Sequence, residues 1–266
     1  RRIKEEMEDD VRMAGELQKK FFPSSYPEFP KGVPPEEQNI EFLHCFELCR
    51  DVGGDYCAVT QISDHEAGIF LCDVSGIGVR AALVTALIRG IMQEIVPLAG
   101  EPGAYLSRMN TTLISLLRQE DLRLDVQACY LIIDISTGRI RLANAGHSVP
   151  IRFCGDRKAE WLCSADAALS APLAVQEGTV YNTITQTIDP GDTVILYTDG
   201  LYTVVNNLDD PFGEKRLIES AHSFAGEPLD EIFDGLKNDA LAFAKSGQFT
   251  DDVCLVGFRL KRLMSS

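Results

Sequence analysis

Acidic residues stand at the ends of several strand-like segments of this 266-residue chain. Asp55 lies in VGGDY, Asp73 in CDVSGIG, Asp199 in YTDGL, and Asp251 and Asp252 lie in FTDDV. Each one alone is typical of a turn, because Asp bonds its own backbone and Gly tolerates positive φ. Asp73 and Asp199, however, follow the apolar runs IFLC and TVILYT, with no Lys or Arg close by in the sequence. A carboxylate at the end of a buried strand needs a compensating partner.

A hard divalent cation could compensate several such carboxylates together. Mg²⁺ and Mn²⁺ favour oxygen ligands in octahedral arrangements and retain several water molecules. Two neighbouring ions lower the pKa of a shared water and neutralise the charge that develops on a phosphoryl group during in-line attack. Sequence spacing alone cannot bring the four loops together, so two-metal hydrolysis is a hypothesis at this point.

The composition is that of a globular protein with a sizeable core, 45% hydrophobic and 24% charged. The formal net charge of −15 argues against nucleic acid or an anionic membrane as the main partner, which leaves metal cations and proteins. No apolar run approaches the length of a membrane span, and the charged start RRIKEEMEDD is no signal peptide. We therefore expect a cytoplasmic domain without membrane insertion, which can still belong to a membrane-attached full-length protein.

The cysteine pattern supports the same compartment. Most of the eight cysteines fall inside apolar, strand-like runs, and no CxxC pair occurs. With only four histidines in the chain, a zinc site is not indicated. We interpret the cysteines as buried, reduced thiols.

The hydrophobic periodicity predicts an α+β fold. We expect helices at residues 1–22, 79–96, 102–118, 214–224 and 229–245. We expect strands at residues 40–48, 55–62, 68–74, 126–135, 139–146, 149–154, 159–163, 181–188, 192–198 and 252–260. The helix at 79–96 is apolar nearly all round, so we expect it to be buried. Hairpin-linked strands with helices in separate pairs indicate largely antiparallel sheets, not βαβ repeats.

We expect residues 1–30 to form an N-terminal linker or signalling helix with a loop, and residues 31–266 to form one domain. In the helix, apolar residues recur at steps of three and four; they are Ile3, Met7, Val11, Ala14, Leu17 and Phe21. Either this stripe docks on the protein's own core, or it belongs to a signalling or dimerising helix that continues from an upstream domain. The absence of an initiator Met favours a piece of a longer protein.

Eight segments resemble, in order, the SpoIIE-type branch of the metal-dependent protein phosphatases (PPM), which is related to protein phosphatase 2C. They are GELQKKFFP, CRDVGGDYC, FLCDVSGIGVRAALV, RMNTTL, IDISTGRIRLANAGHSVP, IDPGDTVILYTDGLYTVVN, FGEKRLIE and TDDVCLV. They extend from about Ala14 to Phe258, nearly the whole chain. The resemblance implies an αββα sandwich of two mainly antiparallel β-sheets flanked by helix pairs, with two Mn²⁺ or Mg²⁺ ions at one edge.

The resemblance also implies residue roles. Asp73 would bridge both metals, and the backbone carbonyl of Val74 would bind one of them. Asp199 and Asp251 would complete the ligands of the other ion, and Asp55 would act directly or through a metal-bound water. The nucleophile would be the metal-bridging water, without a phosphoenzyme. The implied supporting residues are Gly53, Gly54, Gly76, Gly200 and Asp252.

The chain departs from the family pattern next to the expected metals. Ile77 in VSGIG stands where histidine is common. Isoleucine can neither orient a water nor assist a leaving alkoxide, which puts any histidine-assisted step in question. His147 in NAGH does match the family, and we interpret it as a structural histidine and not as a metal ligand.

The resemblance implies a protein serine/threonine phosphatase that acts on a phosphorylated regulatory protein of the STAS-type anti-sigma-factor antagonist class, behind a sensory or receiver domain. Control would pass through the N-terminal helix, with homodimer formation, and through the helix at 79–96. Three alternatives stay open: a catalytically weak or dead phosphoprotein-binding module, a structural dimerisation unit, and a metal-dependent nucleotide hydrolase. The missing P-loop pattern and the negative charge argue against the last.

Overall fold

Two five-stranded sheets lie face to face, and neighbouring strands in each sheet are antiparallel. The computed structural model describes residues 2–76, 78–117, 124–155, 157–164 and 170–264. The first sheet contains, in spatial order, β1 (Ile40–Glu47), β10 (Val253–Leu260), β9 (Thr193–Tyr197), β6 (Ile151–Cys154) and β7 (Lys158–Trp161). The second contains β2 (Tyr56–Gln61), β3 (Glu66–Val74), β4 (Val126–Asp134), β5 (Arg139–Ala145) and β8 (Ile184–Thr187).

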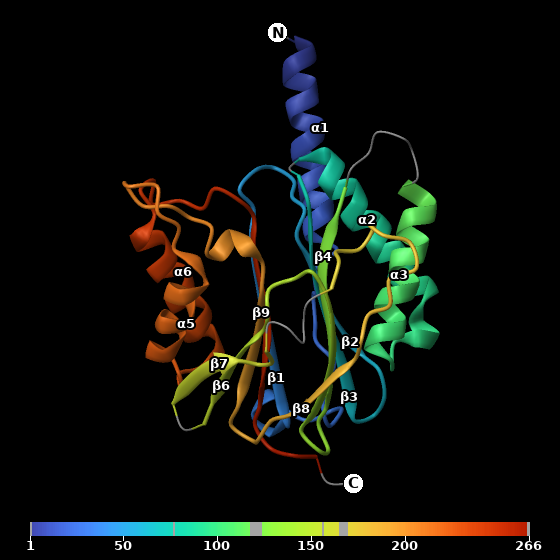
Figure 1. Ribbon diagram of the computed structural model, residues 1–266, viewed down its shortest axis with the longest axis vertical. Helices are drawn as coiled ribbons and strands as arrows, with labels where there is room; N and C mark the ends of the chain where they lie inside the picture. Colours follow the sequence, from blue (N-terminus) through green and yellow to red (C-terminus); the bar gives the residue numbers. More distant parts are fainter. Residues whose placement is uncertain (1, 77, 118–123, 156, 165–169, 265–266) are drawn as a thin grey trace.

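A helix pair covers the outer face of each sheet (Figure 1). The helices are α1 (Arg2–Lys19), α2 (Val79–Glu94), α3 (Pro102–Leu117), α5 (Gly213–Ser223) and α6 (Leu229–Phe243), with short 3-10 helices η1 (Pro35–Glu37), η2 (Val96–Leu98) and η3 (Asp199–Leu201). α2 and α3 pack on the second sheet, and α5 and α6 pack on the first. The expected αββα sandwich is confirmed.

Three hydrophobic layers hold the sandwich together. One lies between the sheets, and one lies between each sheet and its helix pair. Central strands are therefore buried on both faces: all five residues of β9 and nearly all of β4 are buried. This explains why these segments read as continuous apolar runs and not as an alternation of polar and apolar residues. The strand ends are thus the places where polar side chains can gather.

The ends of the predicted elements need small corrections. The helix expected at residues 79–96 stops at Glu94, and Val96–Leu98 form a 3-10 turn around Pro97. Its expected burial on all sides is wrong, because Val79 and Leu83 are exposed and only one face packs on the sheet. The hairpin predicted at STG is confirmed, with Gly138 at φ 71° between β4 and β5.

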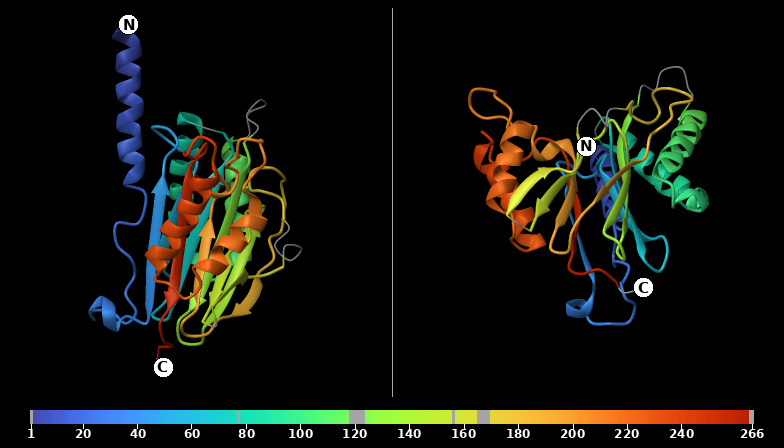
Figure 2. Two further views of the ribbon diagram at one scale, coloured as in Figure 1. Left: turned by 90° about the vertical axis from the view of Figure 1, so that its left-hand side faces the viewer. Right: turned by 60° about the horizontal axis from the view of Figure 1, so that its bottom comes forward.

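The N-terminal part of α1 extends beyond the sandwich, whereas its last turns contact the loop before β2 and α2 (Figures 1 and 2). Most of its apolar stripe is not docked on the protein's own core: Ile3, Met7 and Leu17 are 71%, 63% and 58% exposed. Docking holds only for the last residue of the stripe, Phe21, which packs against the layer between the second sheet and its helices. Within the described part of α1, the buried residues are Gly15 and Gln18.

The segment after α1 joins the sandwich. Phe22 and Phe29 are buried in the layer between the sheets. The domain boundary at residue 30 stays a prediction. No described helix combines the length and the apolar character needed to cross a bilayer.

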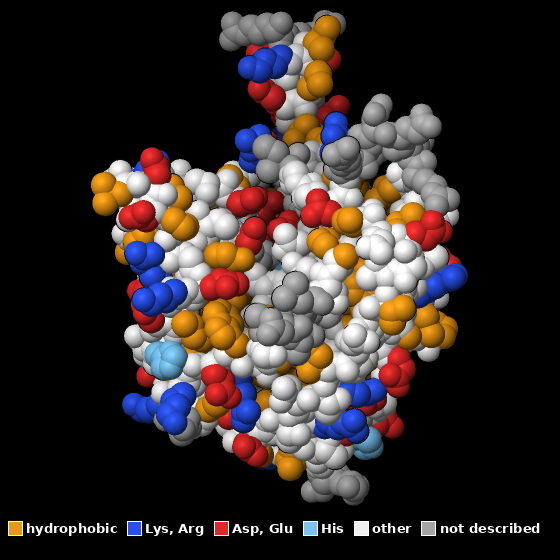
Figure 3. Space-filling model, in the orientation of Figure 1, with side chains coloured by type: hydrophobic (Ala, Val, Ile, Leu, Met, Phe, Trp, Pro, Cys, Tyr) orange, Lys and Arg blue, Asp and Glu red, His pale blue; other side chains and the backbone are white. Residues whose placement is uncertain are grey.

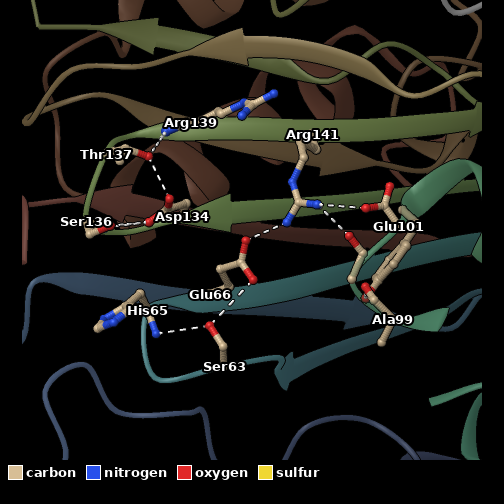
Figure 4. A network of polar contacts seen from close by, with 12 residues as sticks. Ser63, His65, Glu66, Ala99, Glu101, Asp134, Ser136, Thr137, Arg139 and Arg141 are labelled. Atoms are coloured by element: carbon tan, nitrogen blue, oxygen red, sulfur yellow. Dashed lines mark hydrogen bonds and ion pairs between the residues drawn. The ribbon is translucent and has the colours of Figure 1, made fainter. Parts of the chain in front are cut away.

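A charged network fixes the end of β3 that lies away from Asp73 (Figure 4). Arg141 on β5 donates to Glu66 at the start of β3 and to the backbone oxygen of Gly100. Its guanidinium also lies 3.8 Å from Glu101, just before α3. Arg141 is about one-fifth exposed, so these charge-assisted hydrogen bonds are partly shielded from water. The network links β3, β5 and the start of α3 at this end.

Candidate metal centre

The predicted acidic residues meet at one end of the two sheets. Tyr56 pairs with Cys72, so Asp55 before β2 lies beside Asp73 in β3. Leu255 pairs with Tyr197 in the other sheet. Asp199 lies two residues after the end of β9, and Asp251 and Asp252 directly precede β10. Antiparallel pairing therefore brings loops that are distant in sequence to the same edge.

A buried threonine connects the two sheets at this edge. The Thr198 hydroxyl donates to Oδ2 of Asp55 over 2.6 Å, and it accepts from the backbone N–H of Cys254 over 2.8 Å. Thr198 is 1% exposed and Asp55 is 2% exposed. A short, buried hydrogen bond to a carboxylate restrains the carboxylate group, since neither partner can exchange it for water. Asp55 on the second sheet is thereby held against β9 and β10 of the first.

The carboxylates raise one another's pKa. Burial, and then the charge of Asp73, raise the pKa of Asp55 well above its ordinary value. Burial, and then the charge of Asp199, raise the pKa of Asp73 to about 7. Burial and Asp251 raise the pKa of Asp199. Such mutual destabilisation is expected where like charges share a partly dry site, and a bound cation would relieve it.

Asp251 and Asp252 have different surroundings. Asp252 is buried, and its two carboxylate oxygens accept from the backbone N–H groups of Cys49 (2.8 Å) and Gly54 (3.0 Å). Asp252 therefore fixes the loop before β2. Burial raises its pKa, while these N–H groups and the charge of Arg50 oppose the rise. Asp251 is exposed, and its Oδ1 accepts from the Asp252 N–H.

Glycines allow the backbone to pass closely here. A Cβ on Gly53 would lie 2.0 Å from Oδ2 of Asp252, and one on Gly54 would lie 2.5 Å from the carbonyl oxygen of Val74. A Cβ on Gly200 would lie 2.0 Å from the Asp252 carbonyl oxygen. Larger residues at these positions would push apart the segments that carry the carboxylates. Gly76, which follows Val74 by two residues, has φ 97°.

The donor set suits Mg²⁺ or Mn²⁺. The available groups are oxygens from Asp side chains and from the Val74 carbonyl, which are the ligands these ions prefer. Figure 3 shows acidic side chains gathered near the base of α1, between the two helix pairs. Within the described residues, no three His, Cys, Asp or Glu side chains are already grouped around one point. The fit therefore rests on donor chemistry and shared electrostatics and not on a preformed coordination shell.

His147 has the surroundings of a structural residue. Its backbone N–H and C=O exchange hydrogen bonds with the side chain of Asn144, both at 2.8 Å. Its Nδ1 lies 3.2 Å from the carbonyl oxygen of Ser148. Burial lowers its pKa to about 4, so the ring is neutral. Its Nε2 is buried and has no hydrogen-bond partner among the described residues. These contacts support the structural interpretation, and Ile77 lies outside the described residues.

Sequence reasoning singled out neither Thr198, Arg50 nor Gln18. Thr198 sits between an apolar strand and an aspartate, where turn chemistry already explains it. Arg50 is the basic residue whose charge reaches Asp252, and it stands in the same CRDVGGD segment as Asp55. Gln18 gave a weak signal only, because it borders the apolar stripe of α1 and could equally have been solvated.

Alanine substitution at two glycines should change stability in opposite directions. Gly53→Ala places a methyl group against Asp252 and should lower the free energy of unfolding by about 1–3 kcal/mol through overpacking. Gly90→Ala lies on α2 with nothing within 4 Å of the added Cβ, so it should raise that energy by about 0.5–1 kcal/mol. Urea unfolding of both variants tests this. A Gly53→Ala variant as stable as the parent would contradict the close approach.

The metal-free protein should lose stability as pH rises. A carboxyl whose pKa is raised on folding contributes stability that is fully present below its ordinary value of 3.8 and lost as pH rises through its folded value. For Asp73 the folded value is about 7. The free energy of unfolding, measured with urea in the presence of a chelator, should therefore fall by on the order of 1–3 kcal/mol between pH 5 and pH 8. Asp73→Asn should flatten this slope, and a stability that rises over the same interval would contradict the shared-charge description.

Known proteins share this sequence and this fold. The chain is 26% identical to phosphoserine phosphatase RsbP of Bacillus subtilis (strain 168), over 84% of this chain and 53% of RsbP. It thus spans about half the length of that relative. The SiaA-PP2C domain of Pseudomonas aeruginosa superposes with a TM-score of 0.78 at 20% identity, over 97% of this chain and 98% of that one. The catalytic domain of the serine/threonine phosphatase PstP, in complex with two manganese ions, superposes with a TM-score of 0.56 at 15% identity, over 83% of this chain and 97% of that one.

At these identities the solved structures show the fold alone. The family itself follows from the sequence: the family model for Stage II sporulation protein E (SpoIIE) matches residues 63–261, well over half of the chain. The matched range contains Asp73, Asp199 and Asp251 and covers the eight strands from β3 to β10, whereas β1 and β2 precede it. Together with the two-sheet sandwich, this match confirms the resemblance carried by the eight segments. The chain belongs to the SpoIIE family.

Proposed function

We propose that this chain hydrolyses phosphoserine or phosphothreonine on another protein, with two Mn²⁺ or Mg²⁺ ions bound where the two sheets end together. The observation that carries the proposal is the meeting of Asp55, Asp73 and Asp199 at one edge, where burial, and then the charge of a neighbouring carboxylate, raise the pKa of each. Further support comes from the phosphatases that share the family or the fold, one of which is a complex with two manganese ions. Two-metal sites of this kind stabilise the attacking and leaving oxygens of a phosphoryl transfer.

The residues at this edge would have different roles in metal binding. Asp73, the Val74 carbonyl, Asp199 and Asp251 would hold the ions, and Asp55 would hold a metal-bound water or bind directly. Bound there, the ions would activate a water for in-line attack and neutralise charge on the phosphoryl group. The hydroxyl of Thr198 orients Asp55 over 2.6 Å. Hydrogen bonds from neighbouring residues to a metal-binding side chain fix the orientation of that side chain.

The proposed substrate is a phosphorylated regulatory protein. RsbP is a phosphoserine phosphatase by name, and the chain covers about half of it. We extend that activity to this chain and propose a STAS-type anti-sigma-factor antagonist as the substrate, with a sensory or receiver domain upstream. The negative charge of the chain, −15, fits a protein substrate that is engaged through bound cations better than it fits nucleic acid.

Phosphatase activity should require Mn²⁺ or Mg²⁺ and the central aspartate. Turnover of a phosphoserine peptide and of p-nitrophenyl phosphate should appear with added Mn²⁺ and fall by at least about 100-fold in Asp73→Ala, because the ligand proposed to bridge the ions is lost. Asp64→Asn, at an exposed position between β2 and β3, is the matched control and should retain activity. Binding of a phosphoprotein without any turnover would instead support the binding-module alternative.

We further propose that α1 pairs with the α1 of a second copy. Ile3, Met7 and Leu17 form an exposed apolar stripe on a helix whose N-terminal part extends beyond the sandwich. A stripe with steps of three and four is the seam that a helix pair buries. The partner is a second copy because the same stripe on both helices is self-complementary, as a two-fold interface requires.

Charged residues in this stripe should abolish self-association. Light scattering should detect a weak dimer with a dissociation constant on the order of 10–100 µM, since two short stripes bury less than the ~1,200 Å² of a standard interface. Met7→Glu combined with Leu17→Glu should be monomeric. Lys19→Glu makes the same change in net charge at an exposed position next to the buried Gln18 and should leave the dimer intact. A monomeric parent protein at the highest soluble concentration would refute the pairing.

A further inference from the structure

Two hydroxyl groups form a pair beside the acidic edge. Oγ of Ser148 lies 3.0 Å from the phenol oxygen of Tyr202. Tyr202 directly follows the 3-10 turn that begins at Asp199, and Ser148 lies in the loop between β5 and β6. Both residues are half-buried, so the pair is packed against the protein and still accessible to a small group that enters the edge.

Strand pairing brings the loop that carries Ser148 to the same edge as the carboxylates. Asn144, near the end of β5, pairs with Cys129 of β4. Two residues before Cys129 in the same strand, Gln127 pairs with Asp73 of β3. The loop that follows β5 therefore begins at the edge where the acidic residues meet.

Hydrogen bonds hold this loop in place. The side chain of Asn144 exchanges two hydrogen bonds of 2.8 Å with the backbone of His147. Nδ1 of His147 lies 3.2 Å from the carbonyl oxygen of Ser148. The phenol of Tyr197, in β9, donates to the carbonyl oxygen of Val149 over 3.1 Å. The position of the Ser148 hydroxyl is thus fixed from both sheets.

The backbone and the ring of Tyr202 are fixed as well. Its N–H donates to the carbonyl oxygen of Asp199, and its carbonyl oxygen accepts from the N–H of Gly213, both over 2.9 Å. Its ring meets the ring of Tyr197 edge-on, with the ring centroids 6.1 Å apart. The phenol oxygen therefore has a defined position near the first aspartate of this turn.

The pair has one more hydroxyl proton than its own contact uses. Either oxygen can donate in the bond between them, and within the described residues this is the hydrogen bond that each hydroxyl makes. Because each hydroxyl carries one proton, one O–H is left for another acceptor. Burial, and then the charge of Asp199, raise the pKa of Tyr202, so the phenol stays protonated at neutral pH. Ionised carboxylates only accept, so a neutral donor beside them serves a different partner.

We propose that Tyr202, oriented by Ser148, binds the phosphate group of the substrate by donating its O–H to a phosphoryl oxygen. This inference rests on the function proposed above and adds to it a substrate contact from the side chains of this protein. An O–H donor is directional, and its hydrogen bond to an ionised oxygen is stronger than one to a neutral acceptor. The phosphate is anionic before and during the reaction, so the contact stabilises both states, and its loss raises KM more than it lowers kcat.

Tyr202→Phe tests the contact, since it keeps the ring against Tyr197 and removes only the hydroxyl. In the Mn²⁺-loaded protein, calorimetry should show the affinity for inorganic phosphate weakened at least about tenfold, as expected for a lost hydrogen bond to a charged group. KM for a phosphoserine peptide should rise about 10- to 100-fold while kcat changes by less than about threefold. The affinity for Mn²⁺ should stay that of the parent, because the hydroxyl is not among the proposed metal ligands.

Tyr26→Phe is the matched control. It removes the hydroxyl of another half-buried tyrosine, whose oxygen lies 2.6 Å from Nδ1 of His44. Tyr26 lines a cavity together with Lys261, which follows β10 at the end opposite to Asp251 and Asp252. Phosphate affinity, KM and Mn²⁺ affinity should therefore all stay unchanged in this variant.

The outcomes separate the two proposals. Parent-like phosphate affinity in Tyr202→Phe overturns the contact and leaves the proposed function standing. A lower kcat with unchanged KM and phosphate affinity overturns it too, because the hydroxyl would then act on the leaving oxygen and not on the bound phosphate. A parent protein that binds no Mn²⁺ overturns the proposed function, and the contact with it. If Tyr202→Phe does not fold, Ser148→Ala replaces it and should weaken phosphate binding about 2- to 5-fold by releasing the phenol from its partner; parent-like affinity there overturns the role equally.

Discussion

Confinement of like charges at the common end of two sheets is the constraint on which the rest of this structure depends. Asp73 lies near the end of β3, Asp55 immediately precedes β2 and Asp199 begins the 3-10 helix after β9, so the sheets limit the movement of all three. Burial, and then their mutual repulsion, raise their pKa values. The surrounding structure must therefore hold them in place against that repulsion. The hydrophobic layers on both sides of each sheet provide the rigidity, and the Thr198–Asp55 hydrogen bond fixes the two sheets relative to each other at this point.

The loop between β1 and β2 shows how backbone contacts carry out this task. Both carboxylate oxygens of Asp252 accept hydrogen bonds from backbone N–H groups, whereas its neighbour Asp251 is exposed. Adjacent residues of the same type thus have separate uses, one for shape and one for ligand binding. Gly53 and Gly54 make this arrangement sterically feasible, because a methyl group on either would collide with Asp252 or with Val74. Gln18 closes the loop from the opposite side.

The sequence allowed the prediction of most of this fold, because its layers impose strong local patterns. Strands buried on both faces read as apolar runs, and the STG turn predicted the β4–β5 hairpin. The acidic positions were visible too, although only the family resemblance grouped them. Contacts between distant segments could not be predicted. The stripe of α1 left open whether the helix docks on the core or pairs with another helix, and it gave no sign of the contact through Gly15 and Gln18, since a close backbone approach leaves no trace in hydrophobic periodicity. Thr198 and Asp55 are 143 residues apart, and nothing local distinguishes a crosslinking threonine from a turn residue.

The acidic edge has a consequence for the order of events in the proposed reaction. A phosphoserine side chain carries nearly two negative charges at neutral pH, and the chain it must approach has a formal charge of −15. Before cations are bound, the edge that should receive the phosphate repels it over roughly one Debye length, about 8 Å in physiological salt. Cations must therefore arrive first, and the phosphoprotein second. Under metal limitation such an enzyme stays free of its substrate and does not trap it in an unproductive complex.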